Sequence, residues 1–339
     1  MFEALDQFVE HPFAATVTLG VGIALLLLGG HWLVSGTVTI ARRLGVSTLV
    51  VGLTVVALGT SSPELFFNVI AARNGHPDLS FGNIVGSNIA NIGLILGLTA
   101  LVSPLAVHGR IVSKELPWLI AVSAATIVLA VVPLGASGSG FGRFDGVLML
   151  IGFAVFMVSW YRMGRRDAAD PLVRELSVEA EAETRASIIG ASVLCLVGLS
   201  GLVAGGKLSE TSAVAIARTL GLSEALIGLT IVAIATSLPE LATCVVACRR
   251  GHHDLAVGTV VGSNLFNLLL VLGTTAIVHP VGVPASHGWQ DLSMMLFIAL
   301  LLLPMAVTHR NKITRTEGAV LLALYLGYMA WIVAREKPW

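Results

Sequence analysis

The chain has few charged side chains and few aromatic ones. Of its 339 residues, 12% are Asp, Glu, Lys or Arg and 6% are Phe, Trp or Tyr, whereas 55% are hydrophobic. Several apolar runs exceed the roughly 18 residues that cross the hydrocarbon core of a bilayer. The composition therefore excludes a soluble domain and predicts a multi-pass membrane protein.

Net charge and cysteine are also scarce. The 20 basic residues balance the 20 acidic ones, so charge gives no indication of nucleic acid or of an acidic partner. Cys195, Cys244 and Cys248 are interpreted as small apolar packing residues, because two thiols on one helix face without further ligands make a weak zinc site. No Lys or Arg precedes the first apolar run, so we expect no cleavable signal peptide.

Hydropathy predicts ten membrane spans, and the basic residues predict their orientation. The spans are 13–37, 47–74, 79–103, 112–134, 144–162, 187–212, 223–250, 254–278, 288–308 and 316–335. With the N-terminus outside, the inner loops hold 14 of the 20 Lys and Arg residues. Because cytoplasmic loops are enriched in these residues, we expect a cell-membrane protein with both termini outside.

The only extended polar segment, residues 161–185, joins the two halves on the inner side. It is too short for a domain of its own. We therefore expect a first half of five helices at 1–165, an inner linker at 166–186, and a second half of five helices at 187–339.

An internal duplication relates the two halves. Gly45 to Pro104 aligns with Gly221 to Pro280 at a constant offset of 176, and 32 of the 60 pairs are identical. Since each half has an odd number of spans, the second copy enters the membrane upside down relative to the first. Inverted repeats of this kind are typical of secondary transporters, whose binding sites form where the halves meet.

Each copy carries one acidic residue inside an apolar helix. Glu64 lies in GTSSPEL and Glu240 in ATSLPEL. A charge at the bilayer centre costs at least about 2.5–3.5 kcal/mol, so such residues are usually functional. A single buried Glu could serve only as a hydrogen-bonding group between helices, but two at equivalent positions favour a functional role.

A proline precedes each of these glutamates and predicts a broken helix. Pro63 lacks an N–H and crowds the preceding turn, so the carbonyl groups of residues 57–60 are expected to lack helical partners, and Pro239 repeats this in the seventh span. Carboxylates, free carbonyl groups and nearby hydroxyls make an all-oxygen cage. Hard cations such as Ca²⁺ and Na⁺ prefer oxygen ligands, and two negative charges match one Ca²⁺.

The third and eighth spans are predicted to supply the walls of this cage. Ser87 and Asn91 share one helix face, as do Ser263 and Asn267. A stripe of small residues on the same helices is interpreted as a surface for close helix packing. Its members are Gly82, Gly86, Ala90, Gly258 and Gly262.

These motifs resemble the repeats of the sodium/calcium exchanger family, prokaryotic type, within the calcium/cation antiporters. GTSSPEL with GSNIAN and ATSLPEL with GSNLFN carry the resemblance, which extends over the ten-span length. It implies a Ca²⁺ site formed by Glu64, Glu240 and the carbonyls of Thr60 and Thr236. It further implies Na⁺ sites near Ala57, Thr60 and Ser87 and near Ala233, Thr236 and Ser263, with Asn91 and Asn267 between them and Ser61 and Ser237 nearby.

The implied activity is alternating-access exchange of Ca²⁺ for Na⁺ across the membrane. The chain is not expected to be an enzyme or to hold a cofactor, and its partners are the two transported ions and the lipid bilayer. Many relatives have Asp where this chain has Asn267, which argues against potassium dependence but leaves Ca²⁺/H⁺ antiport as the alternative. A cation channel would not explain the inverted halves, and no aromatic or basic cluster near the repeats suggests an organic solute.

Overall fold

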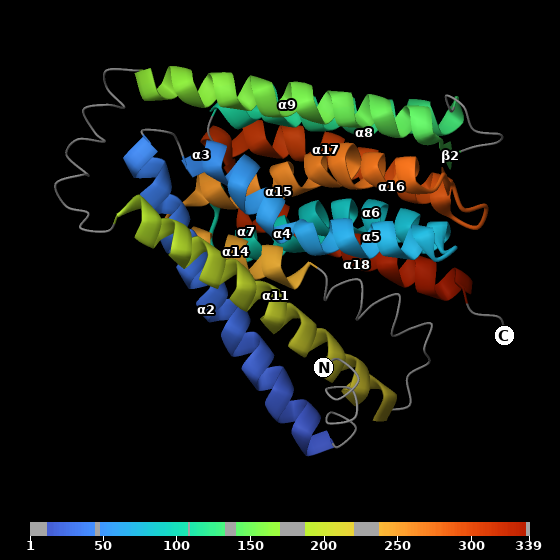
Figure 1. Cartoon of the computed structure of the whole chain (residues 1–339), viewed down its shortest axis with the longest axis horizontal. Helices are drawn as coiled ribbons and strands as arrows, with labels where there is room; N and C mark the ends of the chain where they lie inside the picture. Colours follow the sequence, from blue (N-terminus) through green and yellow to red (C-terminus); the bar gives the residue numbers. More distant parts are fainter. Residues whose placement is uncertain are drawn as a thin grey trace.

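The computed structural model of the chain describes residues 12–44, 48–107, 109–132, 140–169, 187–219 and 237–336. These residues form α-helices, π-helical segments (η) and four strands of two residues each. The structure therefore confirms the all-α class. Figure 1 shows the helices as one bundle, with α2 and α11 lying side by side at an angle to the other helices.

The first half of the chain contains the following elements. They are α2 (Pro12–Leu44), α3 (Thr48–Val51), η1 (Gly52–Val56), α4 (Ala57–Thr60), α5 (Ser62–Arg73), α6 (Pro77–Ala90), η2 (Asn91–Leu96), α7 (Gly97–Val102), β1 (Leu105–Ala106), η3 (Ile111–Glu115), α8 (Leu116–Val131), β2 (Gly140–Phe141) and α9 (Arg143–Ala169).

The second half repeats much of this order in the residues that are described. Its elements are α11 (Ile188–Thr219), α14 (Leu238–Arg249), α15 (His253–Phe266), η5 (Asn267–Val271), α16 (Leu272–Val278), β3 (Val281–Gly282), α17 (Gly288–Asn311), β4 (Lys312–Ile313) and α18 (Arg315–Glu336).

Eight described helices are long and apolar enough to span a membrane. The bent pair Leu49–Thr60 and Ser62–Arg73, which turns by 42°, would make a ninth span. The predicted seventh span begins in residues 223–236, which lie outside the described residues, and continues as α14. The fifth span lies at Arg143–Trp160, close to the predicted 144–162, and its helix α9 continues beyond the span to Ala169.

The centre of the bundle is formed by one helix from each half. The continuous helices Pro77–Val102 and His253–Val278 are 83% and 94% buried over their most apolar windows, whereas the other six spans are 22–39% buried. The central helices are therefore enclosed by protein, and the others keep apolar faces free for lipid. The duplicated GSN motifs lie on these two enclosed helices.

Helices α2 and α11 pack closely through glycines. A Cβ on Gly36 would lie 2.6 Å from the carbonyl oxygen of Ala191, and one on Gly22 would lie 3.0 Å from that of Gly205. Because the order of contacts is reversed between the helices, the two run antiparallel. Small residues at these positions let the backbones approach closely, as is common between membrane helices.

Equivalent glycine turns connect the broken helices to the central ones. Gly75 and Gly251 adopt φ of +85° and +79°. His76 donates its backbone N–H to Ala71 O at 2.9 Å, and His252 donates to Ala247 O at the same distance. This is the Schellman helix ending, which requires a left-handed residue that glycine adopts without a steric penalty. The turns therefore fold α5 back on α6 and α14 back on α15.

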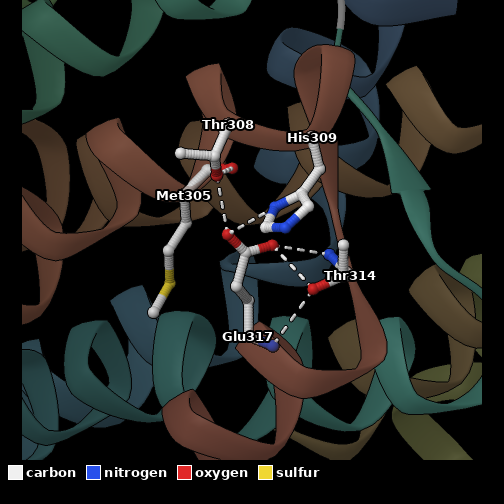
Figure 2. A network of polar contacts seen from close by, with 5 residues as sticks. All are labelled: Met305, Thr308, His309, Thr314 and Glu317. Atoms are coloured by element: carbon white, nitrogen blue, oxygen red, sulfur yellow. Dashed lines mark hydrogen bonds and ion pairs between the residues drawn. The ribbon is translucent and has the colours of Figure 1, made fainter.

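Short strand pairs join connections from the two halves. Strand β1 pairs antiparallel with β4, and β2 pairs antiparallel with β3. Figure 2 shows the polar network between the end of α17 and the start of α18, on either side of β4, in which Glu317 accepts hydrogen bonds from Thr314 N at 2.8 Å and from Thr308 Oγ1 at 2.7 Å. Because the Glu317 N–H donates back to Thr314 Oγ1 at 3.3 Å, the pair forms a capping box that fixes the start of α18.

Candidate cation site

The first helix break lies directly before Glu64. Ser61 has φ −87° and ψ 1° between α4 and α5, and Pro63 occupies the first turn of α5. Proline is tolerated there because first-turn N–H groups have no helical partner. The prediction of a broken second span is confirmed, and the break places Glu64 in the first turn of a new helix.

The carbonyl groups at this break are only partly free. Contrary to the prediction, Ala57 O accepts the Ser61 N–H at 2.9 Å and lies 3.4 Å from Thr60 Oγ1. The reason is that the chain leaves helical geometry at Ser61, one turn later than Ala57. The Gly59 carbonyl loses its helical donor, since Pro63 has no N–H.

The second break repeats the first in its described part. Ser237 has φ −93° and ψ 3°, and Pro239 and Glu240 follow in the first turn of α14. Leu241 N–H donates to Ser237 O at 3.0 Å, as Leu65 N–H donates to Ser61 O at 3.2 Å. The two halves therefore present their glutamates in the same local geometry.

The two glutamates are buried near one another. Glu64 is 4% exposed and Glu240 is 2% exposed, and the two carboxyl groups interact electrostatically. The Thr60 side chain contacts the Glu240 carboxyl across the boundary between the halves. Glu64 Oε2 and Glu240 Oε2 are buried without a hydrogen-bond partner among the described residues.

Helices α6 and α15 contribute amides and hydroxyls beside the breaks. Helix α15 packs against η1 and α4, where a Cβ on Gly262 would lie 2.8 Å from the Ala57 Cβ. Asn91 Nδ2 donates to Asn264 Oδ1 at 2.8 Å, and Asn264 Nδ2 donates to Asn88 O at 3.3 Å. These bonds join the central helices of the two halves at the level of the predicted site.

Several predicted ligand atoms share one property: they are buried oxygens with no hydrogen-bond partner in the described part of the chain. Besides the two glutamate oxygens, these are Ser61 Oγ, Asn91 Oδ1, Ser237 Oγ, Ser263 Oγ and Asn267 Oδ1. Buried polar atoms are normally bonded, so such a group of acceptors points to a ligand. Oxygen atoms of these kinds are the ligands that hard cations prefer.

The other predicted ligand residues differ in how well the structure places them. Ala57, Thr60 and Ser87 are buried beside the first break or on α6. Ala233 and Thr236 lie outside the described residues. Within the described ranges no three His, Cys, Asp or Glu residues cluster as a metal site, so only two acidic ligands meet here.

Other predictions concerned packing. Cys195, Cys244 and Cys248 are buried and free, as predicted. Close packing is confirmed for Gly258 and Gly262, whose added Cβ atoms would approach Leu49 O and Leu53 O to 3.1 and 2.9 Å. Gly82 and Gly86 meet no described atom within 4 Å.

Sequence reasoning missed four features of the site. Asn91 and Asn267 begin π-helical segments, η2 and η5, and a third segment, η1, precedes the first break. Such segments widen a helix turn and often occur at functional sites. The cross-helix role of Asn264 was also missed, although its identity with Asn88 inside the duplicated GSN motif was a usable signal.

These features define an all-helical membrane protein in which an internal duplication brings two carboxylates together at the helix breaks. The chain belongs to the sodium/calcium exchanger protein family, whose model matches residues 14–161 and 190–334. Members of this family are transporters, so the chain is a cation antiporter and not an enzyme.

Similar proteins cover nearly the whole chain. The putative antiporter CaxA of Alkalimonas amylolytica is 38% identical over 317 residues, covering 93% of this chain and 97% of that protein. The sodium/calcium exchanger MaX1 of Methanosarcina acetivorans is 30% identical over 334 residues, covering 91% and 95%. The structure of the sodium-calcium exchanger NCX_Mj soaked with 10 mM Na⁺ and zero Ca²⁺ matches with a TM-score of 0.79 at 30% identity, covering 94% and 99%.

Proposed function

We propose that the chain exchanges Ca²⁺ for Na⁺ across the cell membrane by alternating access, with Glu64 and Glu240 as the shared ligands. The observation that carries this proposal is the pair of buried carboxylates, together with buried hydroxyl and amide oxygens of the duplicated motifs that have no described partner. Two buried anions without compensation are costly, so the cage is stable only with bound positive charge. One Ca²⁺ supplies the matching charge.

The proposed ligands fall into a central set and two flanking sets. Ca²⁺ is held by the carboxylates and by the carbonyls of Thr60 and Thr236. Na⁺ ions use Ala57, Thr60 and Ser87 on one side and Ala233, Thr236 and Ser263 on the other. Asn91 and Asn267 contribute amide oxygens between these sets, with Ser61 and Ser237 nearby.

The proposed topology has ten spans in two inverted halves and both termini outside. The antiparallel packing of the equivalent helices α2 and α11 supports the inversion. The strand pairs support it too, since each pair joins a connection of the first half to one of the second. In this topology the α5–α6 turn faces outward and the α14–α15 turn faces inward, following the bias of basic residues.

Ca²⁺/H⁺ exchange is the alternative, because protons can also neutralise two buried carboxylates. Sodium is favoured by the neutral oxygens, which a proton would not need. These include Ser263 Oγ and Asn267 Oδ1, both buried without a described partner. The relative named as a sodium/calcium exchanger supports the same choice.

The flux experiment separates the candidates. Purified protein in liposomes is loaded with Na⁺, and Ca²⁺ uptake is followed after dilution into choline medium, with an imposed pH gradient in a parallel sample. We expect uptake to require internal Na⁺ and to ignore the pH gradient. Uptake driven by the pH gradient alone would establish proton coupling, and Ca²⁺ conduction without either gradient would establish a channel.

A further inference from the structure

The two repeats differ one turn beyond their glutamates. Asn68 follows Glu64 by four residues, and the equivalent position after Glu240 is Cys244. The neighbouring central helix differs in the same way, since Asn83 of α6 corresponds to Thr259 of α15. A polar group therefore occurs in the first repeat where the second has smaller or less polar side chains.

Asn68 is fully buried and its amide is fixed by two acceptors. Asn68 Nδ2 donates to Glu64 O at 2.7 Å and to Asn83 Oδ1 at 2.8 Å. Ser80 Oγ donates to Asn68 O at 2.9 Å and ties the same turn to α6. Because both amide protons are used, rotating the amide by 180° would break two good hydrogen bonds.

This fixed orientation leaves Asn68 Oδ1 as an acceptor without a donor. The atom is buried and has no hydrogen-bond partner in the described structure. It lies on the same helix face as Glu64, since residues four apart are neighbours on a helix surface. The first repeat therefore presents a further oxygen one turn from its carboxylate, toward the α5–α6 turn.

The second repeat has no unpartnered oxygen at the positions equivalent to Asn68 and Asn83. The Cys244 thiol donates to Ala256 O at 3.4 Å, and Thr259 Oγ1 donates to Leu255 O at 2.8 Å in its own helix. Both polar hydrogens are thus directed at backbone carbonyls. The first repeat therefore has an amide oxygen without a described partner beside its carboxylate, at a position where the second repeat has a thiol.

Exposure of the polar side chains decreases in steps from the α5–α6 turn to Glu64. Asn74 in the α5–α6 turn is exposed, Asn83 is partly buried, and Asn68 and Glu64 are buried. The side chains along these steps supply amide oxygens, which replace water in the coordination shell of a hard cation. A neutral oxygen suits a monovalent ion, because it adds no charge that would trap the ion.

We propose that Asn68 Oδ1 is an auxiliary ligand for Na⁺ that enters or leaves from the α5–α6 end. This inference rests on the proposed Na⁺/Ca²⁺ exchange, and it adds that the apparent Na⁺ affinity differs in its dependence on Asn68 between the two membrane faces. The Asn83 amide oxygen orients the Asn68 amide. The second repeat has Cys244 at the position of Asn68 and so lacks this amide oxygen. Apparent Na⁺ affinity should therefore depend on Asn68 only at the membrane face where the α5–α6 turn is exposed.

The test uses right-side-out and everted membrane vesicles from an expressing bacterial host, which present opposite faces. An impermeant maleimide at Asn74→Cys identifies the face of the α5–α6 turn, since the three native cysteines are buried. The concentrations of Na⁺ and of Ca²⁺ that give half-maximal transport are then measured at each face. The variants are Asn68→Cys, which copies the second repeat, and Cys244→Ala as its matched control.

In Asn68→Cys we expect half-saturating Na⁺ to rise several-fold at the α5–α6 face and to stay unchanged at the opposite face, while Cys244→Ala changes neither. Equal changes at both faces, or none, would overturn the inference. If Asn68→Cys does not fold, Asn83→Thr serves, because it removes an acceptor that orients the amide. Absence of Na⁺-dependent Ca²⁺ flux in the unmodified chain would instead refute the proposed function.

Discussion

At the residue scale, the position of each glutamate in a first helical turn explains only part of its stability as an anion. The partial positive charge at a helix N-terminus contributes roughly 0.3–1 kcal/mol, and up to about 2 kcal/mol in buried geometry. Placing a charge near the bilayer centre costs at least about 2.5–3.5 kcal/mol. The cost of burying both charges exceeds the stabilisation that the two helix ends supply, so Glu64 and Glu240 depend on a bound cation or proton.

The equivalent asparagines differ in their environments, which predicts different effects of substitution. Asn91 Oδ1 and Asn267 Oδ1 both lack a described donor, but Asn91 Nδ2 donates to Asn264 Oδ1, a bond with no described counterpart at Asn267. Asn267→Asp should therefore fold and transport, with a stronger pH dependence than the unmodified chain, because the new carboxyl binds protons in competition with cations. Transport is measured in proteoliposomes from about pH 6 to about pH 8.5, a range in which buried carboxyl groups in proteins can titrate.

The comparison variant is Asn91→Asp. An ionised carboxylate at this position could not donate to Asn264 Oδ1, and two acceptors would then face each other in a buried position. We expect this variant to lower the thermal midpoint in detergent by more than Asn267→Asp does. Equal midpoints, or a pH profile of Asn267→Asp identical to that of the unmodified chain, would contradict this description of the two amides.

The residues of the site were predictable to the extent that the duplication marks them. Glu64, Glu240, Asn91 and Asn267 stand out because each occurs in a motif that is kept in both copies. The bond between Asn91 and Asn264 could not be predicted, since it depends on how two helices 173 residues apart cross. The sequence shows that Asn68 and Cys244 occupy equivalent positions. Only the structure shows that the Asn68 amide oxygen is left without a described donor.

At the element scale, the first break and the π-helical segments of the site all adjoin helix α15. Helix α15 packs against η1 and α4, and η5 begins at Asn267. Proline predicted the breaks in the sequence, whereas the π-helical segments at the site have no proline and no distinct pattern. They depend on tertiary packing, which is why the sequence did not reveal them.

The contact between α15 and the first break predicts the effect of one added methyl group. A Cβ at Gly262 would lie 2.8 Å from the Ala57 Cβ and 2.9 Å from Leu53 O. Overpacking of this kind typically costs about 1–3 kcal/mol. Gly262→Ala should therefore lower the thermal midpoint and reduce Ca²⁺ transport, because it displaces α15 from the helix that carries Ala57 and Thr60.

The matched control is Gly20→Ala, in α2, where an added Cβ meets no described atom within 4 Å. Alanine is the better helix former, so this variant should keep the midpoint or raise it slightly. Thermal unfolding in detergent and Ca²⁺ flux are measured for both. A Gly262→Ala protein with the midpoint and flux of the unmodified chain would show that this contact does not position the site.

At the scale of the whole molecule, the charge of the cage predicts a response to voltage. Two ionised glutamates balance one Ca²⁺, whereas three Na⁺ leave one net positive charge on the same site. A three-for-one exchange should therefore move one charge per cycle, worth about 2.3 kcal/mol for each 100 mV. The Na⁺ gradient at which net Ca²⁺ flux vanishes should shift with the membrane potential.

Proteoliposomes clamped with potassium and valinomycin at several potentials provide this measurement. The control is the same series without ionophore. A null point that stays constant across potentials would establish electroneutral exchange and would contradict the three-sodium stoichiometry, while leaving the carboxylate site intact.

The whole architecture was more predictable than its details. Composition and hydropathy indicated a multi-pass all-helical protein, and the constant offset of 176 indicated paired halves. The close packing of α2 against α11 was not predictable, because it depends on which glycine-containing faces of the two helices meet. The strand pairs that join the halves contain only two residues each and carry no sequence signal.

The most direct test of the central claim is equilibrium binding of Ca²⁺ to the purified protein at several Na⁺ concentrations. The control is Glu210→Gln, because the Glu210 carboxylate pairs with Lys207 at 3.1 Å in α11, a helix that supplies none of the proposed ligands. For this control and for the unmodified chain, we expect one Ca²⁺ site whose affinity for Ca²⁺ falls as Na⁺ competes for it. Glu64→Gln and Glu240→Gln should each lose this binding while remaining folded. Undiminished Ca²⁺ binding by either folded variant, or Ca²⁺ binding that Na⁺ does not displace, would contradict the claim that both ions share the two carboxylates.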